Sequence, residues 1–252
     1  MSQGSEIAAQ GSPENEQFGP AYPPVTIDYS GEESPYGAPL RQTLKHIITK
    51  VPPGSTLLDI GGSDGRYSIP LAKAGLNVVV FDLISESLEA VERHAAEEGV
   101  SDRITVQQGD VYKHKPFDFR EKDFDATLNA AFISLHNPEQ AKDMNRKAVN
   151  ASKIGALSVV ELYADHYRTD SEGDEVRGKE EYKYSTRGIR ELAADMFGED
   201  FVAADYAETH LIMQDGSHNV DAKVGTFSAV HVPGFRLPRT FFDPFFNTSG
   251  SS

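Results

Sequence analysis

A glycine-rich segment in the first third of the chain has the residue types of a ligand-binding turn. Residues 57–66 read LLDIGGSDGR, so an apolar run interrupted by Asp59 leads into Gly61, Gly62 and Gly65 before a helical pattern begins. Glycine lets the backbone approach a ligand without a Cβ in the way, and the next helix offers free N–H groups to an anionic group. At the carboxyl end of a parallel strand, such a turn predicts a binding site.

The glycine spacing and the acidic residue Asp59 distinguish a dinucleotide, which has a pyrophosphate, from a ligand that has a cationic amine. A dinucleotide fingerprint requires G-x-G-x-x-G, and glycines at 61, 62 and 65 do not match it. Asp59 disfavours a pyrophosphate but suits a ligand with a cationic amine. We expect the amino-acid part of such a ligand to hydrogen-bond the backbone from Gly61 to Ser63, with its ammonium group near Asp59.

Two further polar sites follow at the ends of later apolar runs. Asp82 closes the run VVVFD and precedes Leu83, and an acid at this place accepts hydrogen bonds from ribose hydroxyls. Asp110 follows the third run, where it can accept from an adenine amine while Val111 packs on the ring. Either acid alone is more often a cap or a surface charge.

A fourth site lies at the end of the fourth apolar run. Asn129 and Ala130 stand there, where a small residue leaves room for a ligand, and Phe132 or Ile133 can cover it. The four sites follow four successive runs in the order that one adenosyl ligand requires. This order, more than any single residue, predicts an adenosyl-binding edge.

The elements that must position these residues alternate along the chain. After an N-terminal helix stopped by Pro52-Pro53-Gly54, apolar runs alternate with helical patterns, which predicts a parallel sheet covered on both faces. The expected strands are residues 55–60, 77–81, 103–107, 124–130 and 155–163, and the expected helices are residues 64–74, 85–98 (capped by Ser85), 138–150 and 186–197.

The last part of the chain predicts an antiparallel pair. Residues 201–214 and 221–232 are β-like and are joined by Asp215-Gly216-Ser217, which is a hairpin signal. The predicted fold is therefore α/β, with a doubly wound, mostly parallel, seven-stranded Rossmann-like sheet and a C-terminal antiparallel hairpin.

The expected organisation is one domain with flanking segments. Residues 1–33 lack periodicity and are expected to be disordered or loosely attached, and residues 34–232 form the domain. Residues 164–185 are charged and aromatic without a period, which predicts an insertion or lid. Residues 233–252 form a Phe-rich tail that is either a strap on the body or a disordered end.

The segments LLDIGGSDGRYSIPLAKAG, FDLISESLEAV, QQGDVY and FDATLNAAFISLHNP resemble the successive motifs of class I S-adenosylmethionine-dependent methyltransferases. The resemblance covers roughly residues 34–232. It implies S-adenosylmethionine as the cofactor and binding roles for Asp59, Gly61, Gly62, Gly65, Asp82, Asp110 and Asn129. Ser63 departs from the pattern, because the family has most commonly a glycine there.

A looser resemblance concerns the tellurite-resistance methyltransferases, which act on small acceptors. It rests on Arg66 with Ser68, on the tyrosines 182 and 184 before a helix, and on Glu208-Thr209-His210 before the hairpin. The arginine that follows the family's histidine is replaced here by Leu211. The match is therefore one of layout.

Methyl transfer from a sulfonium is an in-line displacement, so catalysis consists largely of holding the acceptor about 3 Å from the methyl carbon. A general base is needed only where the acceptor must lose a proton, and His136 and Tyr163 are the candidates. His136 equally suits a hydrogen bond in the loop before Pro138, and Tyr163 equally closes the core. Tyr182 and Tyr184 are either cation–π walls or packing residues.

No metal site is expected, because Glu208 and His210 share one strand face without further ligands at a suitable spacing. The chain has 39 acidic and 24 basic residues, a net charge of −15, which argues against nucleic acid and anionic membranes as partners. The absence of cysteine excludes a cysteine nucleophile. The N-terminus is unlike a signal peptide, and no apolar run reaches the length of a membrane span.

These features predict a cytoplasmic protein that acts on a small molecule, and they leave its oligomeric state open. A nucleotide-dependent oxidoreductase on the same fold lacks its glycine spacing. A methyltransferase-like partner or regulatory domain without turnover remains as the alternative.

Overall fold

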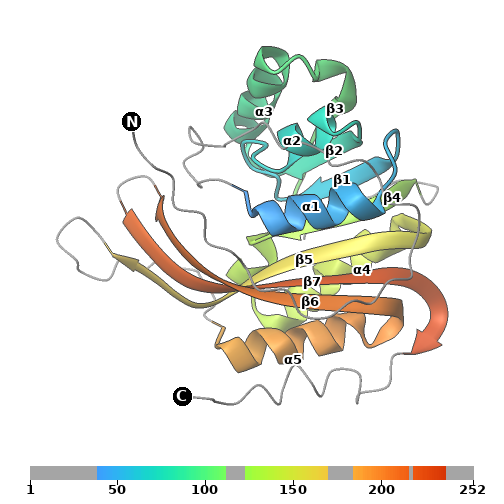
Figure 1. The fold of residues 1–252 in the computed structure, drawn as a ribbon, viewed down its shortest axis with the longest axis vertical. Helices are drawn as coiled ribbons and strands as arrows, with labels where there is room; N and C mark the ends of the chain where they lie inside the picture. Colours follow the sequence, from blue (N-terminus) through green and yellow to red (C-terminus); the bar gives the residue numbers. More distant parts are fainter. Residues whose placement is uncertain (1–38, 112–122, 170–183, 216–217, 237–252) are drawn as a thin grey trace.

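In the computed structural model of the protein, the described residues are 39–111, 123–169, 184–215 and 218–236. They build one seven-stranded sheet (Figure 1), in which the first five strands of the chain run parallel and β7 is antiparallel to both of its neighbours. In sheet order the strands are β3 (Ile104–Gln108), β2 (Asn77–Asp82), β1 (Thr56–Ile60), β4 (Phe124–Ala130), β5 (Ser152–Thr169), β7 (His218–Arg236) and β6 (Glu199–Asp215).

Helices cover both faces of the sheet, as the alternating pattern predicts. One core packs side chains of α1 (Arg41–Lys50), α2 (Ser68–Lys73) and α3 (Ser85–Glu97) against one face of β1 and β2. A second core packs α4 (Pro138–Asn150) and α5 (Thr186–Phe197) against the other face. Two 3-10 turns, η1 (Ser101–Arg103) and η2 (Phe132–Leu135), complete the described elements. The predicted fold class is therefore confirmed.

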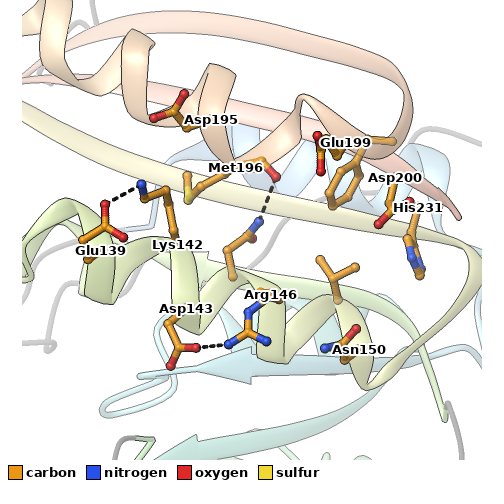
Figure 2. A pocket seen from close by; sticks show the side chains of 13 residues that line it. Glu139, Lys142, Asp143, Arg146, Asn150, Asp195, Met196, Glu199, Asp200 and His231 are labelled. Carbon is orange, nitrogen blue, oxygen red and sulfur yellow. Dashed lines mark hydrogen bonds and ion pairs between the residues drawn. The ribbon is translucent and has the colours of Figure 1, made fainter. Parts of the chain in front are cut away.

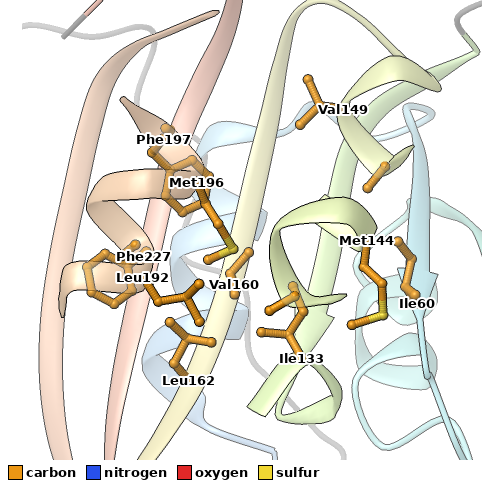
Figure 3. Packing of buried hydrophobic residues seen from close by; sticks show 14 of the residues in the cluster. Ile60, Ile133, Met144, Val149, Val160, Leu162, Leu192, Met196, Phe197 and Phe227 are labelled. Atoms are coloured by element: carbon orange, nitrogen blue, oxygen red, sulfur yellow. The ribbon is translucent and has the colours of Figure 1, made fainter. Parts of the chain in front are cut away.

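The second core is drawn in Figure 3, where Met196 of α5 lies near Val160 of β5 and Met144 of α4 lies near Ile60. These side chains are almost fully excluded from water, so removing any of them costs both transfer free energy and packing. Because side chains of β1, β4 and β5 all belong to this core, their packing fixes the positions of the three strands relative to one another.

Local signals in the sequence set where α4 and α5 begin. The Asn137 side chain accepts a hydrogen bond from Gln140 N at 3.1 Å, and Gln140 Oε1 accepts from Asn137 N at 3.3 Å. With Pro138 in the first turn, this is a complete capping box. Ser185 caps α5 in a simpler way, because its hydroxyl accepts from Gly188 N at 3.1 Å.

Two helix starts differ from the prediction. The helix expected from residue 64 begins at Ser68, since the preceding turn holds left-handed backbone at Gly61 (φ 70°), Ser63 (φ 50°) and Gly65 (φ 86°). Ser85 is the first residue of α3 and not its cap: Ile84 holds the cap position, no side chain there accepts from a backbone N–H, and the Ser85 hydroxyl donates to the Glu86 carboxylate.

The C-terminal strands are longer than predicted. The expected insertion was to begin at residue 164, but residues 164–169 continue β5 and pair with β7 as far as Thr169 and Asn219. Long-range pairing with β7 overrides the weak local pattern there. Residues 170–183 lie outside the described part of the chain.

The other flanking segments are only partly described. β7 runs to Arg236, beyond the expected start of the tail at residue 233. Residues 1–38 and 237–252, which hold most of the predicted lead-in and tail, lie outside the described residues. Within the described residues, no helix combines the length and apolar character that crossing a membrane requires.

Candidate active site

The glycine turn between β1 and α2 is packed so closely that side chains have no room. A Cβ on Gly61 would lie 2.5 Å from the Phe132 ring, and a Cβ on Gly62 would lie 2.5 Å from Val80. Gly61 N–H donates to the carbonyl oxygen of Phe81 at 2.8 Å, which joins the turn to the end of β2. The predicted glycines are therefore required by close approach as well as by backbone conformation.

Asp82 holds the turn from the neighbouring strand. Its Oδ2 accepts from Ser63 N at 3.0 Å, and its Oδ1 accepts from Ile84 N at 3.0 Å. The first bond stabilises Ser63 in a left-handed conformation that a non-glycine residue seldom adopts. Each carboxylate oxygen has a second lone pair, so Asp82 still has acceptor capacity for a hydroxyl. Leu83, beside it, is exposed.

Asp59 is buried beneath the turn. Its Oδ2 accepts a hydrogen bond of 2.6 Å from the Ser68 hydroxyl, at the first residue of α2. Burial raises the pKa of the Asp59 carboxyl to about 7, against the opposing effects of Ser68 and of Arg66. Near neutral pH this carboxyl therefore exchanges between its neutral and charged forms.

Asn129 stands where β4 ends. Its Oδ1 accepts from Ile133 N at 3.0 Å and so fixes the start of η2, while its buried Nδ2 has no hydrogen-bond partner. A buried amide nitrogen without a partner costs free energy. Ala130, next to it, is half-buried. Because Phe132 of η2 lies against Gly61, the end of β4 and the glycine turn are neighbours.

The third strand brings Asp110 and Val111 to the same edge. Gly109 N–H donates to the carbonyl oxygen of Asp82 at 2.9 Å, which ties the end of β3 to the end of β2. Val111 is buried and its carbonyl accepts from Lys147 Nζ at 2.9 Å, whereas Asp110 is half-buried. The predicted cofactor residues thus come together along the carboxyl ends of β1 to β4.

With this geometry established, comparison with known proteins identifies the domain. Residues 57–155 match the family model described as a methyltransferase domain. Residues 57–155 therefore have the sequence features of a methyltransferase domain. The resemblance that the motifs predict is thereby confirmed.

The methyltransferase domain has a curated relative in Streptomyces lavendulae. That protein, L-tyrosine C(3)-methyltransferase, is 35% identical over 107 residues, which are 42% of this chain and 28% of the relative. The match therefore spans less than a third of the relative's length.

Solved structures share the fold. TehB from Haemophilus influenzae has a TM-score of 0.57 at 13% identity, covering 81% of this chain and 66% of TehB. Phosphoethanolamine N-methyltransferase 2 from Haemonchus contortus, in complex with S-adenosyl-L-methionine, has a TM-score of 0.57 at 15% identity, covering 81% of this chain and 56% of that protein. At these identities the likeness shows a shared fold alone.

Both predicted acceptor-side residues of the methyltransferase domain lie near η2. His136 follows η2, and its ring meets the Phe132 ring edge-on with centroids 4.8 Å apart. Burial lowers the pKa of the His136 imidazole. Tyr163 of β5 reaches the same region, because its backbone N–H donates to the Ser134 hydroxyl at 2.8 Å.

Sequence reasoning missed Glu161, which is fully buried within β5. The hydroxyl of Thr43 in α1 donates to Glu161 Oε1, and the Tyr67 hydroxyl lies 2.9 Å from both carboxylate oxygens. Burial raises the pKa of Glu161, while these hydroxyls and Arg66 oppose the shift. The signal that identifies it is a lone acid inside the apolar run LSVVELY.

Arg66 is the buried cation of this group. Its guanidinium lies 5.2 Å from the centre of the Tyr67 ring and hydrogen-bonds the Tyr163 side chain. Nearby carboxylate and hydroxyl groups raise the pKa of Arg66 against the effect of burial. The loop after the glycine turn is thus linked to the predicted acceptor residue Tyr163 and, through Tyr67, to Glu161.

The remaining candidates have structural partners. The Tyr184 hydroxyl donates to the carbonyl oxygen of His136 at 2.7 Å, while Tyr182 lies outside the described residues. Glu208 pairs with Arg190, and His210 Nε2 lies 2.7 Å from Asp221 Oδ1. Across the described ranges, no three His, Asp or Glu side chains gather closely enough to hold a metal ion.

A separate surface pocket of about 450 Å³ lies between α4, the end of α5 and the start of β6. Figure 2 shows Glu139, Lys142 and Asp143 of α4 along it, with Asp195 and Glu199 opposite. None of the residues that line it is a predicted cofactor or acceptor residue. This pocket is therefore distinct from the edge that the glycine turn forms.

Proposed function

We propose that this domain catalyses S-adenosylmethionine-dependent methyl transfer to a small-molecule acceptor by in-line displacement. The observation that carries the proposal is the glycine turn that residues 61, 62 and 65 form at the carboxyl end of β1, within the stretch that matches a methyltransferase domain. When bound, the cofactor supplies an electrophilic methyl group on a sulfonium. The acceptor's electron pair forms the new bond, and the C–S bond breaks with its pair going to sulfur.

The residues at this edge fit such a cofactor. Gly61 and Gly62 leave bare backbone from residue 61 to Ser63, which suits hydrogen bonds to an amino-acid group. Asp82 retains lone pairs for ribose hydroxyls, and Leu83 borders it. Asn129 Nδ2 is an orphaned buried donor at the same edge, which a bound polar group would satisfy.

The remaining cofactor contacts are assigned by their place in the sheet. Asp110 and Val111 follow β3 and are proposed to bind the adenine, the first by accepting from its amine and the second by packing. Ala130 follows β4 and leaves space beside Asn129. Gly65 closes the turn, and its left-handed backbone lets α2 begin three residues later.

On the acceptor side, His136 and Tyr163 are proposed to contact the reacting group. Because burial lowers the pKa of His136, its imidazole is neutral at pH 7 and can accept a proton from an oxygen or nitrogen acceptor. A thiolate acceptor would need no such base. The Streptomyces relative is named for methylation of L-tyrosine, which supports including phenols among the acceptors to be screened.

The proposal is tested by calorimetric titration of the protein with S-adenosylmethionine and S-adenosylhomocysteine. We expect micromolar binding that weakens by about 10- to 100-fold in Asp82→Ala, since hydrogen bonds to a charged group are lost. Asp102→Ala is the matched control, because Asp102 is an exposed acid in η1, away from the edge.

Binding by the wild type justifies a screen of small phenol, amine, thiol and oxyanion acceptors for methyl incorporation. Absence of binding by a folded protein at millimolar ligand would contradict the proposal and favour a partner or regulatory domain.

A further inference from the structure

Lys147 of α4 joins that helix to the turn that follows β3. Its Nζ donates to the carbonyl oxygen of Val111 at 2.9 Å, although the two residues stand 36 positions apart in the chain. In the sheet, β2 and β1 lie between β3 and β4, and α4 follows β4, so this hydrogen bond links parts of the chain on either side of two strands. Val111 is 4% exposed, and a largely buried carbonyl that loses its donor costs free energy.

Lys147 is itself held in place by Asp143, one turn earlier on α4. Asp143 Oδ2 accepts from Lys147 Nζ at 2.8 Å, while Asp143 Oδ1 pairs with Arg146. The hydrogen bond from Lys147 lowers the pKa of Asp143 below its ordinary value, and the pairing with Arg146 adds to this effect. An acid four residues before a lysine also has the favourable order for a pair on a helix. The ammonium of Lys147 therefore lies between a carboxylate on its own helix and the Val111 carbonyl.

The turn after β3 is held at both ends. At its start, Gly109 N–H donates to the carbonyl oxygen of Asp82 at 2.9 Å, which ties the turn to β2. At its end, the Val111 carbonyl is bonded to Lys147, and the Val111 side chain packs in the core to which α4 contributes. Asp110 stands between these two anchors, so its position depends on both.

We propose that Lys147 is a positioning residue for recognition of the cofactor's adenine, acting through Val111. The inference rests on the proposed function, in which Asp110 accepts from the adenine amine and Val111 packs on the ring. A group that recognises a ligand must be held within about 0.5 Å of its productive position by the residues around it. The bond from Lys147 restricts the last residue of the turn and, with it, the Asp110 carboxylate. Removing this bond should therefore relax the choice of base more than it weakens contacts with the rest of the ligand.

The test compares two ligands that differ only in the base. S-adenosylhomocysteine and S-inosylhomocysteine, which has a carbonyl oxygen in place of the adenine amine, are titrated calorimetrically into the wild type and into Lys147→Met. The wild type should prefer the adenine ligand by about 10- to 100-fold, because Asp110 meets a donor in one ligand and an acceptor in the other. Lys147→Met keeps the apolar stem and removes the donor, and it should reduce that preference by about 3- to 10-fold.

Two matched variants separate this role from general effects of α4. Lys142→Met removes a lysine of the same helix that pairs with Glu139 and lines the separate surface pocket, so it should keep the wild-type preference. Lys147→Arg keeps a cationic donor and should retain more of the preference than Lys147→Met. Asp143→Asn should reduce the preference less than Lys147→Met does, because the bond to Val111 remains while its support is lost. These last two variants also carry the test if Lys147→Met does not fold.

The outcomes are distinguishable. Equal weakening of both ligands in Lys147→Met, with the preference unchanged, would show that Lys147 supports the fold and has no part in base recognition. A similar drop in Lys142→Met would assign the effect to the charge of α4 as a whole. If the wild type binds both ligands equally, the adenine assignment of Asp110 is wrong and this inference falls with it. If the folded wild type binds neither ligand, the proposed function itself fails.

Discussion

Asp59 is a carboxyl group that the fold keeps from water at the end of β1, with one hydroxyl from Ser68 as its hydrogen-bond donor. Its pKa of about 7 in the folded chain lies well above the value of about 4 expected in an unfolded chain. The folded state therefore holds the proton more tightly than the unfolded state does. The stability that this group contributes is fully present below about pH 4 and is lost as the pH rises through about 7.

Substitution Asp59→Asn should remove this loss, because an amide keeps an acceptor for Ser68 and carries no charge. We expect the free energy of unfolding to fall less between about pH 5 and about pH 8 in the variant than in the wild type. Urea denaturation at the two pH values measures the difference. Asp102→Asn should follow the wild type, and equal falls in Asp59→Asn and wild type would show that Asp59 is not the titrating group.

At the scale of elements, the notable feature is how α1 is held on the sheet. The hydroxyl of Thr43 bonds Glu161 of β5, and the backbone N–H of Leu40, at the start of α1, donates to the Tyr67 hydroxyl at 2.9 Å. Tyr67 in turn bonds Glu161. α1 is therefore tied both to the central sheet and to the loop that follows the glycine turn.

Thr43→Val should loosen this attachment, since it keeps the side-chain shape and removes one donor to a buried carboxylate. We expect a loss of about 1–3 kcal/mol in the free energy of unfolding. We also expect faster amide hydrogen exchange along α1 than in the wild type. Thr49→Val is the matched control on the same helix, because the exposed Thr49 hydroxyl bonds only the backbone carbonyls of Lys45 and His46. If both variants lost the same amount of stability, the loss in Thr43→Val would come from the helix propensity of valine and not from the missing hydrogen bond to Glu161.

At the scale of the whole molecule, repulsion between the excess negative charges destabilises the folded state. The formal net charge is −15, and ion pairs such as Lys142–Glu139, Arg187–Glu191 and Arg236–Glu199 are at least partly exposed and contribute little each. Added salt screens repulsion between surface charges beyond the Debye length, which is about 8 Å at 0.15 M.

The urea midpoint should therefore rise when sodium chloride is raised from low concentration to about 0.15 M at pH 7. The change should appear in the midpoint with little change in the denaturant slope, because the surface exposed on unfolding stays the same. A falling midpoint would show that the ion pairs outweigh the general repulsion. Sucrose at matched osmolality is the control for effects unrelated to charge.

Much of the fold could be predicted from local patterns, and the exceptions have identifiable causes. Residues 124–130 and 138–150 form the predicted strand and helix with the predicted bounds, since period and capping signals lie within the segment itself. α2 begins late because left-handed residues interrupt the helical pattern. β5 extends to Thr169 because its partner is β7, some fifty residues later in the chain.

The sequence by itself determined the alternation of strands and helices, the glycine turn and the resemblance to a methyltransferase domain, because these depend on residues close together in the chain. Only the tertiary structure decided which acid at the turn has a partner. Asp59 is satisfied by Ser68, whereas Asp64 is buried without a donor. It also decided that Glu161 is bonded to Thr43, 118 positions away. Burial and hydrogen bonding depend on which distant segments pack together, and no local pattern contains that information.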